Sequence, residues 1–337
     1  MYRLALQFLL LTSALLSLSA QSAQPIYIGL DADMSAVAKE GGIAIKRGAL
    51  IAIDEINANG GVLGRPFSLI EKDHRGNPAR GIANIKAFAK QENLVAVLGG
   101  VHTPVAMKEL PEIHKNNMIY LDPWAAGTPV IDNGFEPNYA FRVSVRDAEA
   151  GKVLIRHAKS RGLTRIGLLL ERTGWGRSNE ASMTAAALDI GVEIVGVEWF
   201  NWGQKDVSKQ ISALVNLGID SFALVANAPE GAVIGKHILL NSAAAKLPIL
   251  SHWGIAGGAF VEKLGLENLK KLDLSVLQTY SFLAPYDEMK NTKVIASYQR
   301  MFDPSVSASS LPAAVGVAHA YDLVHLLAKA IEKAKSI

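Results

Sequence analysis

The chain has 337 residues, half of them apolar, with 34 Lys and Arg against 31 Asp and Glu and a net charge of +3. This length and apolar share are enough for two hydrophobic cores, so we expect two domains rather than one. The near-neutral charge and the lack of a dense basic run give no support for nucleic-acid binding. The chain has no cysteine, which excludes disulfides, thiolate metal sites and lipid attachment through an N-terminal cysteine.

The first element along the chain is an apolar leader. Arg3 gives it a positive start, residues 4–18 form an apolar run, and Leu18-Ser19-Ala20 offers a small-residue cleavage site. The alternative is an uncleaved anchor, but the run is shorter than the roughly 20 residues needed to span a bilayer. We therefore predict a signal peptide over residues 1–23 and export of the mature protein to the periplasm.

From Ile26 onward, short apolar runs alternate with amphipathic segments. This order predicts a parallel sheet covered by helices on both faces. The helix over 43–58 carries an apolar stripe that includes Ile45, Ala49 and Ala52, and it ends at Asn59-Gly60-Gly61, where glycine can take a left-handed conformation. The predicted strands are 26–30, 67–70, 95–98 and 118–121, and the predicted helices are 43–58, 78–91 and 104–115.

The same alternation restarts after Phe141-Arg142-Val143. The sequence therefore predicts an α/β fold with two Rossmann-like lobes of parallel sheet, joined by hinge crossings near residues 141 and 277. Ligands of open parallel sheets lie beyond the carboxyl ends of the strands, so a ligand cleft is expected between the lobes. The second set of strands is 166–170, 192–197, 222–225 and 249–250, with an extended crossing at 274–279, and its helices are 147–161, 178–190, 206–217, 229–244, 287–301 and 311–335.

Several segments carry a resemblance to a known family. They read IGLDADMS, KRGALIAIDEINANGGVLGRPFSLIEKDHRGNPARG, VAVLGGVHTPVA and IYLDPWAAGTP, with looser matches at RIGLLLERTGWGRS and AAVGVAHAYDLVHLLAKAIEKA. The chain resembles the type I periplasmic solute-binding proteins, specifically the leucine/isoleucine/valine-binding family of ABC transporters. Family members usually continue for several tens of residues beyond the segment that matches the last helix here.

The resemblance implies a two-lobed clamp that closes on a small solute and presents it to the membrane permease of an ABC transporter. The first lobe would comprise residues 24–141 plus 280–337, and the second lobe residues 142–279. The resemblance also implies a monomer that performs no catalysis and needs no cofactor or metal.

In the first lobe, the family holds the carboxylate of its ligand with residues that follow two strands. Val101 and Thr103 follow the strand at 95–98, and the Thr103 hydroxyl with nearby backbone N–H groups could bind an anionic oxygen. The alternative is that Thr103 only caps a helix that starts at Pro104.

The second place in the first lobe is the segment of Trp124, Ala125 and Ala126, which follows the strand at 118–121. The family usually has small residues and a threonine here, and Ala126 stands at the threonine position unless Thr128 replaces it through a local shift. Backbone groups of Trp124 and Ala126 could still contact the ligand, whereas the alternative for Trp124 is a surface side chain packed on the lobe.

In the second lobe, the resemblance implies contacts from Trp175, Asn227 and Trp253. The family commonly has an aromatic residue at the position of Trp175, where it covers the ligand, and a buried structural tryptophan is the alternative. Trp253 stands where branched-chain amino-acid binders have the carboxylate that pairs with the ligand's ammonium. Because a buried, unpaired ammonium costs several kcal/mol or more, we favour an aromatic or other carboxylate over an amino acid, which stays the alternative. Gly41, where some members have an aromatic side chain, would leave extra room.

Two rival functions are weaker. An enzyme lacks support, because no G-x-G-x-x-G, G-x-S-x-G or P-loop motif follows a strand. His102 and His252 could face one cleft as a metal site, but two histidines alone make this a poor candidate. A ligand-sensing periplasmic or receptor domain remains the alternative to transport, since the same clamp serves in signalling systems.

Overall fold

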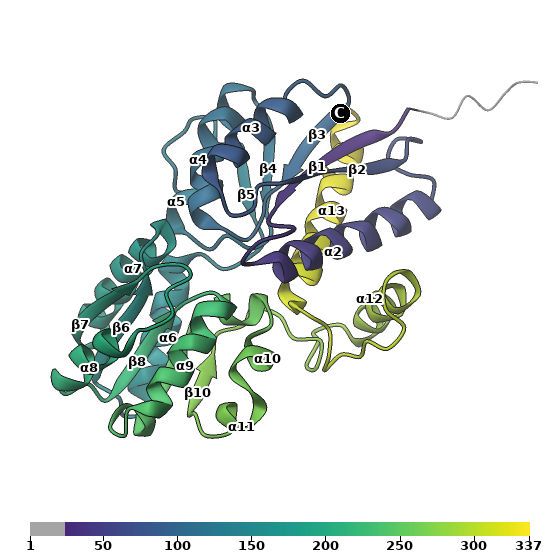
Figure 1. The fold of residues 1–337 in the computed structure, drawn as a ribbon. Coiled ribbons are helices and arrows are strands. Elements are labelled where there is room, and N and C mark those ends of the chain that lie inside the picture. The colour runs from purple at the N-terminus through teal and green to yellow at the C-terminus, as the bar shows by residue number, and fades with distance from the viewer. Residues whose placement is uncertain (1–23) are drawn as a thin grey trace, which may run out of the picture.

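The structure, a computed structural model, describes residues 24–337 and contains two parallel β-sheets of five strands each (Figure 1). Helices cover the faces of both sheets, as the alternation of strands and helices predicted. The predicted signal peptide at 1–23 lies outside the described residues. We call the unit built on each sheet a lobe, numbered in chain order.

The sheet of the first lobe has the strand order β2-β1-β3-β4-β5, and all its pairs are parallel. Its strand β1 lies between β2 and β3 and is buried, because Ile26, Ile28 and Leu30 are apolar and fully covered. The strands are β1 (Ile26–Ala32), β2 (Phe67–Asp73), β3 (Leu94–Leu98), β4 (Ile119–Asp122) and β5 (Ala140–Arg142), and the helices between them are α2 (Lys39–Ala58), α3 (Pro78–Phe88), α4 (Thr103–Lys115) and α5 (Thr128–Ile131).

The sheet of the second lobe has the order β10-β9-β8-β6-β7 and is also parallel throughout. Short helical turns replace a single long helix between its last two strands. The strands are β6 (Arg165–Glu171), β7 (Glu193–Phe200), β8 (Ser221–Val225), β9 (Ile249–Ser251) and β10 (Leu274–Val276). The helical segments are α6 (Asp147–Ser160), α7 (Gly174–Ile190), α8 (Ser208–Asn216), α9 (Ala228–Leu240), η1 (Ala244–Lys246), η2 (Trp253–Gly257), α10 (Phe260–Leu264) and α11 (Leu266–Leu269).

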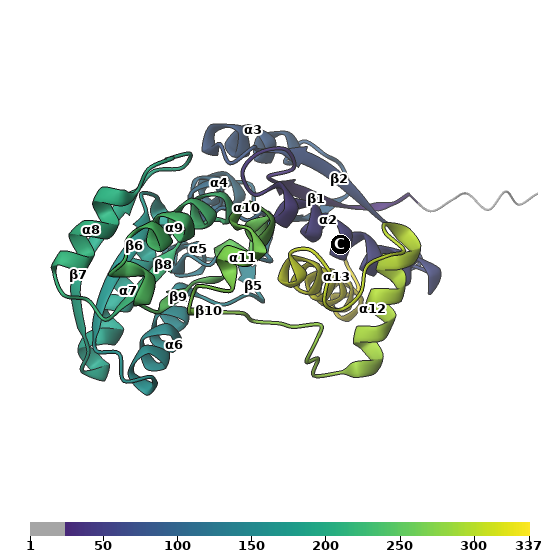
Figure 2. The ribbon, with the colours of Figure 1, turned by 60° about the horizontal axis from the view of Figure 1, so that its bottom comes forward.

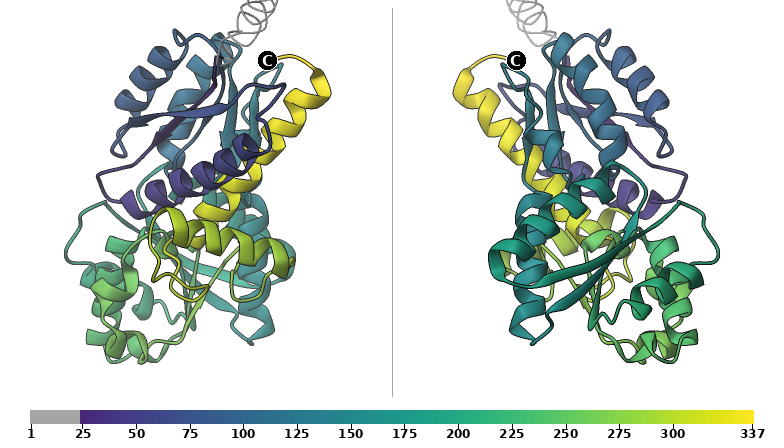
Figure 3. Two further views of the ribbon diagram at one scale, coloured as in Figure 1. Left: turned by 90° about the vertical axis from the view of Figure 1, so that its right-hand side faces the viewer. Right: turned by 90° about the vertical axis from the view of Figure 1, so that its left-hand side faces the viewer.

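The last two helices, α12 (Glu288–Met301) and α13 (Ala314–Ala334), return to the first lobe. The side views show α13 lying along α2 (Figure 3). By length and composition α13 could span a membrane, but 67% of its most apolar stretch is buried inside the protein. Its apolar character is therefore explained by packing in the core.

Within residues 24–337, the chain passes between the lobes at two places. The first follows β5, and the second is the extended segment between β10 and α12, which runs from one lobe to the other (Figure 2). These crossings lie where the sequence predicted them, although β5 was expected as part of the crossing and not as a strand. The exact lobe limits, 24–141 plus 280–337 and 142–279, stay a prediction.

Most predicted elements appear within a few residues of their expected ends, and the α2 helix ends at the predicted glycine turn, with Gly60 and Gly61 at φ of 96° and 74°. The helix expected over 229–244 is shorter, since α9 ends at Leu240 and η1 follows after a break at Asn241. The sequence analysis missed β5, α5, η2, α10 and α11, each of five residues or fewer. Such short segments contain too few residues to show a helix or strand period.

Candidate ligand site

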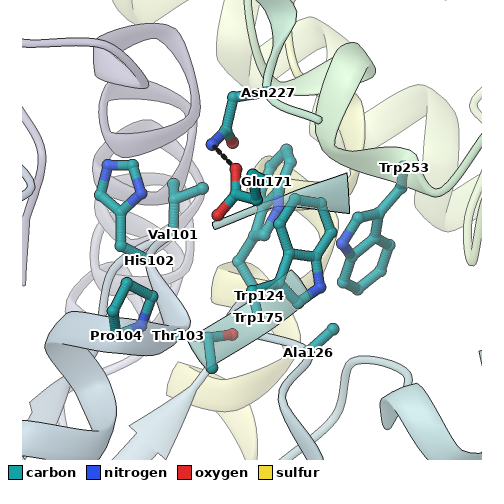
Figure 4. A pocket seen from close by; sticks show the side chains of 10 residues that line it. All are labelled: Val101, His102, Thr103, Pro104, Trp124, Ala126, Glu171, Trp175, Asn227 and Trp253. Atoms are coloured by element: carbon teal, nitrogen blue, oxygen red, sulfur yellow. Dashed lines mark hydrogen bonds between the residues drawn. The ribbon is translucent and has the colours of Figure 1, made fainter. Parts of the chain in front are cut away.

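A pocket lies between the lobes, where loops from the carboxyl ends of both sheets meet (Figure 4). Its walls lie close together: the room for the centre of a water-sized sphere is about 10 Å³, on the order of a single water molecule. Of the eight predicted site residues, Ala125 alone does not line it. The lining residues are Val101, His102, Thr103, Pro104, Trp124, Ala126, Glu171, Trp175, Asn227 and Trp253.

The first wall of the pocket is the N-terminus of α4. The helix begins at Thr103, and no side chain caps it. Pro104 has no N–H, and the N–H groups of Val105 and Ala106 both donate to the His102 carbonyl at 3.0 Å, so the Thr103 N–H is the first-turn amide left without a helical partner. The interpretation of Thr103 as a cap for a helix starting at Pro104 is wrong. Its hydroxyl instead accepts a hydrogen bond from the Gly127 N–H at 3.1 Å and keeps its own proton free to donate.

The loop after β4 is held by Arg142 at the end of β5. The guanidinium contacts the Asp122 carboxylate at 3.0 Å and donates to the carbonyl groups of Ala125, Ala126 and Gly127. Burial raises the pKa of Asp122, and Arg142 opposes that shift. Because the Ala125 carbonyl is already bound and its side chain lies in the core, Ala125 is separated from the pocket.

The backbone of this loop is also largely occupied. The N–H of Trp124 donates to Asp122 Oδ1 at 3.0 Å. The carbonyl of Ala126 accepts from Arg142 and from the Asp147 N–H at 2.8 Å. Ligand contacts through these two backbone groups would therefore compete with protein hydrogen bonds.

The Trp124 ring is buried between three glycines and is only 2% exposed. A β-carbon added at Gly41, Gly257 or Gly316 would lie 3.9, 3.0 or 2.9 Å from a ring atom. The interpretation of Trp124 as a surface side chain is therefore wrong. So is the expected extra room at Gly41, since Val101 and Trp124 fill that space.

Trp175 lies in the first turn of α7, where the Thr173 hydroxyl accepts the Trp175 N–H at 3.1 Å and fixes the start of the helix. The indole Nε1 donates to Asp147 Oδ1 at 3.2 Å. The ring meets His252 edge-on, with ring centroids 5.1 Å apart. Trp175 is thus both a pocket wall and part of a buried hydrogen-bond network.

Trp253 begins η2, and its ring centroid lies 5.8 Å from that of Trp124 in the other lobe. The Trp253 N–H donates to Nδ1 of His252, so Nε2 of His252 carries a proton and donates it to Asp147 Oδ1 at 3.1 Å. This network fixes the aromatic residues of the second lobe against the start of α6.

The pocket wall also contains a buried carboxylate, that of Glu171, which was not among the predicted site residues. Its side chain accepts hydrogen bonds from the Thr173 hydroxyl at 2.5 Å, the Trp202 Nε1 at 2.9 Å and the Asn227 amide at 2.9 Å; Figure 4 shows the last of these. Burial raises the pKa of Glu171 to about 7, with Glu230 nearby adding to the shift. Its position directly after the predicted strand at 166–170 was a signal that could have found it.

A further residue that lines the pocket is His102. Nε2 of His102 lies 3.0 Å from Asp33 Oδ2. Despite its burial, hydrogen bonds from His102 and from the N–H groups of Ala38 and Ala36 hold the pKa of Asp33 down at about 2. His102 and His252 are thus each paired with a different aspartate, and residues 24–337 contain no group of three or more side chains of metal-ligand type.

The sequence and structure match known proteins over nearly the whole described chain. A family model described as periplasmic binding protein matches residues 25–337. The Leu/Ile/Val-binding protein homolog 3 of Brucella melitensis is 23% identical over 92% of this chain and 80% of its own length. An R. palustris solute-binding protein, solved with 4-hydroxybenzoate, superposes with a TM-score of 0.78 at 19% identity, covering 93% of this chain and 82% of the other. LivJ of Streptococcus pneumoniae, solved with isoleucine, gives a TM-score of 0.77 at 21% identity, covering 93% and 85%.

Proposed function

Because the chain belongs to the periplasmic binding protein family, in its leucine/isoleucine/valine-binding branch, we propose that it captures a compact carboxylate for an ABC transporter by closing its lobes on it. The observation that carries the proposal is the pocket itself. The uncapped N-terminus of α4 in the first lobe faces indole rings and a buried carboxylate of the second lobe.

The anionic end of the solute would bind at α4. The Thr103 N–H, which has no helical partner, and the helix dipole favour a negative charge. The Thr103 hydroxyl has its oxygen engaged by Gly127 and its proton available, so it can donate to a carboxylate oxygen.

The body of the solute would pack against Trp175 and the edges of Trp124 and Trp253, all of which line the pocket. Aromatic pairs contribute about 0.5–1.5 kcal/mol each beyond the burial of area. These rings favour a planar body, and we propose an aromatic carboxylate as the preferred class.

The far end of the solute would meet Glu171. Glu171 provides the carboxylate partner for an ammonium that Trp253 cannot provide, so the cost of a buried, unpaired ammonium does not count against an amino acid here. Among the residues that the structure describes, its Oε1 accepts a hydrogen bond from Thr173 alone and can take one more donor. We therefore propose that the solute carries a hydrogen-bond donor, such as a hydroxyl or an ammonium, opposite its carboxylate.

Thermal-shift and calorimetric titration with 4-hydroxybenzoate, benzoate, leucine, isoleucine and valine tests this proposal. We expect 4-hydroxybenzoate to raise the melting temperature most, and Glu171→Gln to weaken its binding while benzoate binding changes little. Tight leucine or valine binding without any response to the aromatic acids would overturn the ligand class. No response to any small carboxylate in a wider panel would overturn solute capture at this pocket.

We also propose that the mature protein works as a monomer in the periplasm and meets a membrane permease through its exposed lobe surfaces. Permease and ATPase genes beside its own would support transport, and a kinase or regulator gene would support the sensing alternative.

A further inference from the structure

The loop between β7 and α8 extends from the second lobe toward the first (Figure 2). Trp202 lies in this loop, and its ring centroid is 5.0 Å from that of His102 in the first lobe. It also approaches the turn after β2, since a β-carbon added at Gly76 would lie 3.5 Å from the Trp202 ring. Trp202 therefore bridges the lobes at a place distant in sequence from both crossings.

The side of the bridge in the second lobe is fixed by buried acids. The indole Nε1 of Trp202 donates to Glu171 Oε2 at 2.9 Å, and the N–H of Gly203 donates to Glu230 Oε1 at 2.9 Å. Glu171 is 1% exposed and Glu230 is 3% exposed. Hydrogen bonds to buried acceptors of this kind hold the loop in one position.

The side of the bridge in the first lobe is fixed as well. His102 is 3% exposed and is paired with the fully buried Asp33. Asp33 in turn accepts the N–H groups of Ala36 and Ala38, which precede α2. The imidazole thus presents a fixed face to Trp202.

We propose that Trp202 is a latch that holds the lobes together over the pocket, and that a solute enters or leaves only when its indole separates from His102. The proposal rests on the proposed function, because it assigns Trp202 a role at the same pocket. Both contacts of the latch, His102 and Glu171, line that pocket, and Figure 4 shows His102 at the end away from Trp253.

The latch acts on the equilibrium between open and closed lobes. A contact made only in the closed state lowers the free energy of that state relative to the open one, and so raises the closed population. Loss of the latch should therefore lower the closed population and speed the release of a bound solute. A tenfold change in either quantity corresponds to about 1.4 kcal/mol.

The cysteine-free chain allows a direct measurement. Lys90→Cys and Lys209→Cys place two exposed labels, one in each lobe, and spin-label distance distributions then report lobe separation. Trp202→Ala removes the latch, whereas Trp202→Phe keeps an aromatic ring but loses the donor to Glu171. Trp199→Phe on β7 is the matched control, since its ring lies beside Arg172 and outside the pocket.

We expect Trp202→Ala to shift the distribution of the ligand-free protein toward longer distances, with Trp202→Phe intermediate and Trp199→Phe unchanged. For whichever of 4-hydroxybenzoate and isoleucine binds, Trp202→Ala should raise the dissociation rate at least tenfold. Identical distance distributions for Trp202→Ala and the unsubstituted pair, with and without these probes, would overturn the latch. If neither probe binds, the proposed ligand fails, and the ligand-free distributions still decide the latch.

Discussion

At the scale of single residues, Trp175 combines two roles that the sequence analysis treated as alternatives. It lines the pocket, and its indole also donates to the buried Asp147. A ring held by its own hydrogen bond loses little conformational freedom when a solute arrives. The bound geometry is therefore largely present before binding.

We predict that Trp175→Ala weakens binding of the best carboxylate ligand at least tenfold. The variant should also have a lower melting temperature, because truncating a buried tryptophan lowers the free energy of unfolding by about 3–5 kcal/mol. Trp175→Phe separates the two effects, since it keeps a ring at the pocket but loses the hydrogen bond to Asp147. Calorimetric affinities that match the unsubstituted protein for both variants would contradict a role for Trp175 in binding.

A second residue-scale feature is the buried pair of Asp31 and Glu109. Tyr120 donates to one carboxyl oxygen of Glu109, and Asn84 donates to one of Asp31. The remaining oxygens, Asp31 Oδ2 and Glu109 Oε1, have no hydrogen-bond partner within residues 24–337. These two oxygens can hydrogen-bond to each other only when one of the acids is protonated. Burial and the neighbouring Glu109 both favour the protonated form and raise the pKa of Asp31.

This pair predicts a stability that falls as pH rises. The pKa of Asp31 is higher in the folded protein than the 3.8 of a free carboxyl, so the protein takes up a proton when it folds. The stabilisation that this proton provides is lost as pH rises toward the folded pKa. Lys72 opposes the shift, and Asp122 adds to the shift of Glu109.

We expect Asp31→Asn to flatten the fall in melting temperature between about pH 6 and pH 9, because its amide donates to Glu109 without a titrating proton. Thermal unfolding across this range measures the effect. Asp54→Asn is the control, since Asp54 is a half-exposed carboxylate paired with Arg300. Parallel pH curves for Asp31→Asn and the unsubstituted protein would contradict the shared proton.

At the scale of elements, the packing of α2 on α13 depends on a glycine. A β-carbon at Gly48 would lie 2.1 Å from the Val317 carbonyl oxygen, and Gly316 similarly adjoins the Trp124 ring at 2.9 Å. The helix backbones therefore approach more closely than any larger side chain permits. This contact joins segments more than 260 residues apart in the chain.

We predict that Gly48→Ala lowers the free energy of unfolding by about 1–3 kcal/mol through overpacking. Helix propensity alone predicts the opposite sign, because alanine favours a helix interior over glycine by roughly 0.5–1 kcal/mol. Gly235→Ala in α9 is the matched control, since its β-carbon would meet only the ends of Leu264 and Leu272 side chains, at 3.1 and 3.3 Å. Chemical denaturation showing a more stable Gly48→Ala variant would contradict the close packing.

At the scale of the whole molecule, the repeated alternation of strands and helices was sufficient to predict two parallel sheets. Each short apolar run has the length of a strand, and the segments between the runs have the period of a helix. The pocket was predictable to the extent that it lies on loops after strands. Glu171 directly follows the predicted strand at 166–170, but a single glutamate there matches no motif, so it was not selected as a site residue. Trp202 was not predicted as a contact between the lobes, because that contact depends on how the two lobes approach each other, which local sequence does not encode. The burial of Trp124 depends on Gly41, Gly257 and Gly316, which come from three separate elements.

The clustering of indole rings at the pocket has an optical consequence. Of the five tryptophans in the chain, Trp124, Trp175 and Trp253 line the pocket and Trp202 bridges the lobes beside it. Indole emission depends on contact with water and on nearby quenching groups, and the fifth ring, Trp199, lies outside the pocket. The ultraviolet emission of the unlabelled protein should therefore report solute capture directly, with nearly all of its change arising from one place in the molecule.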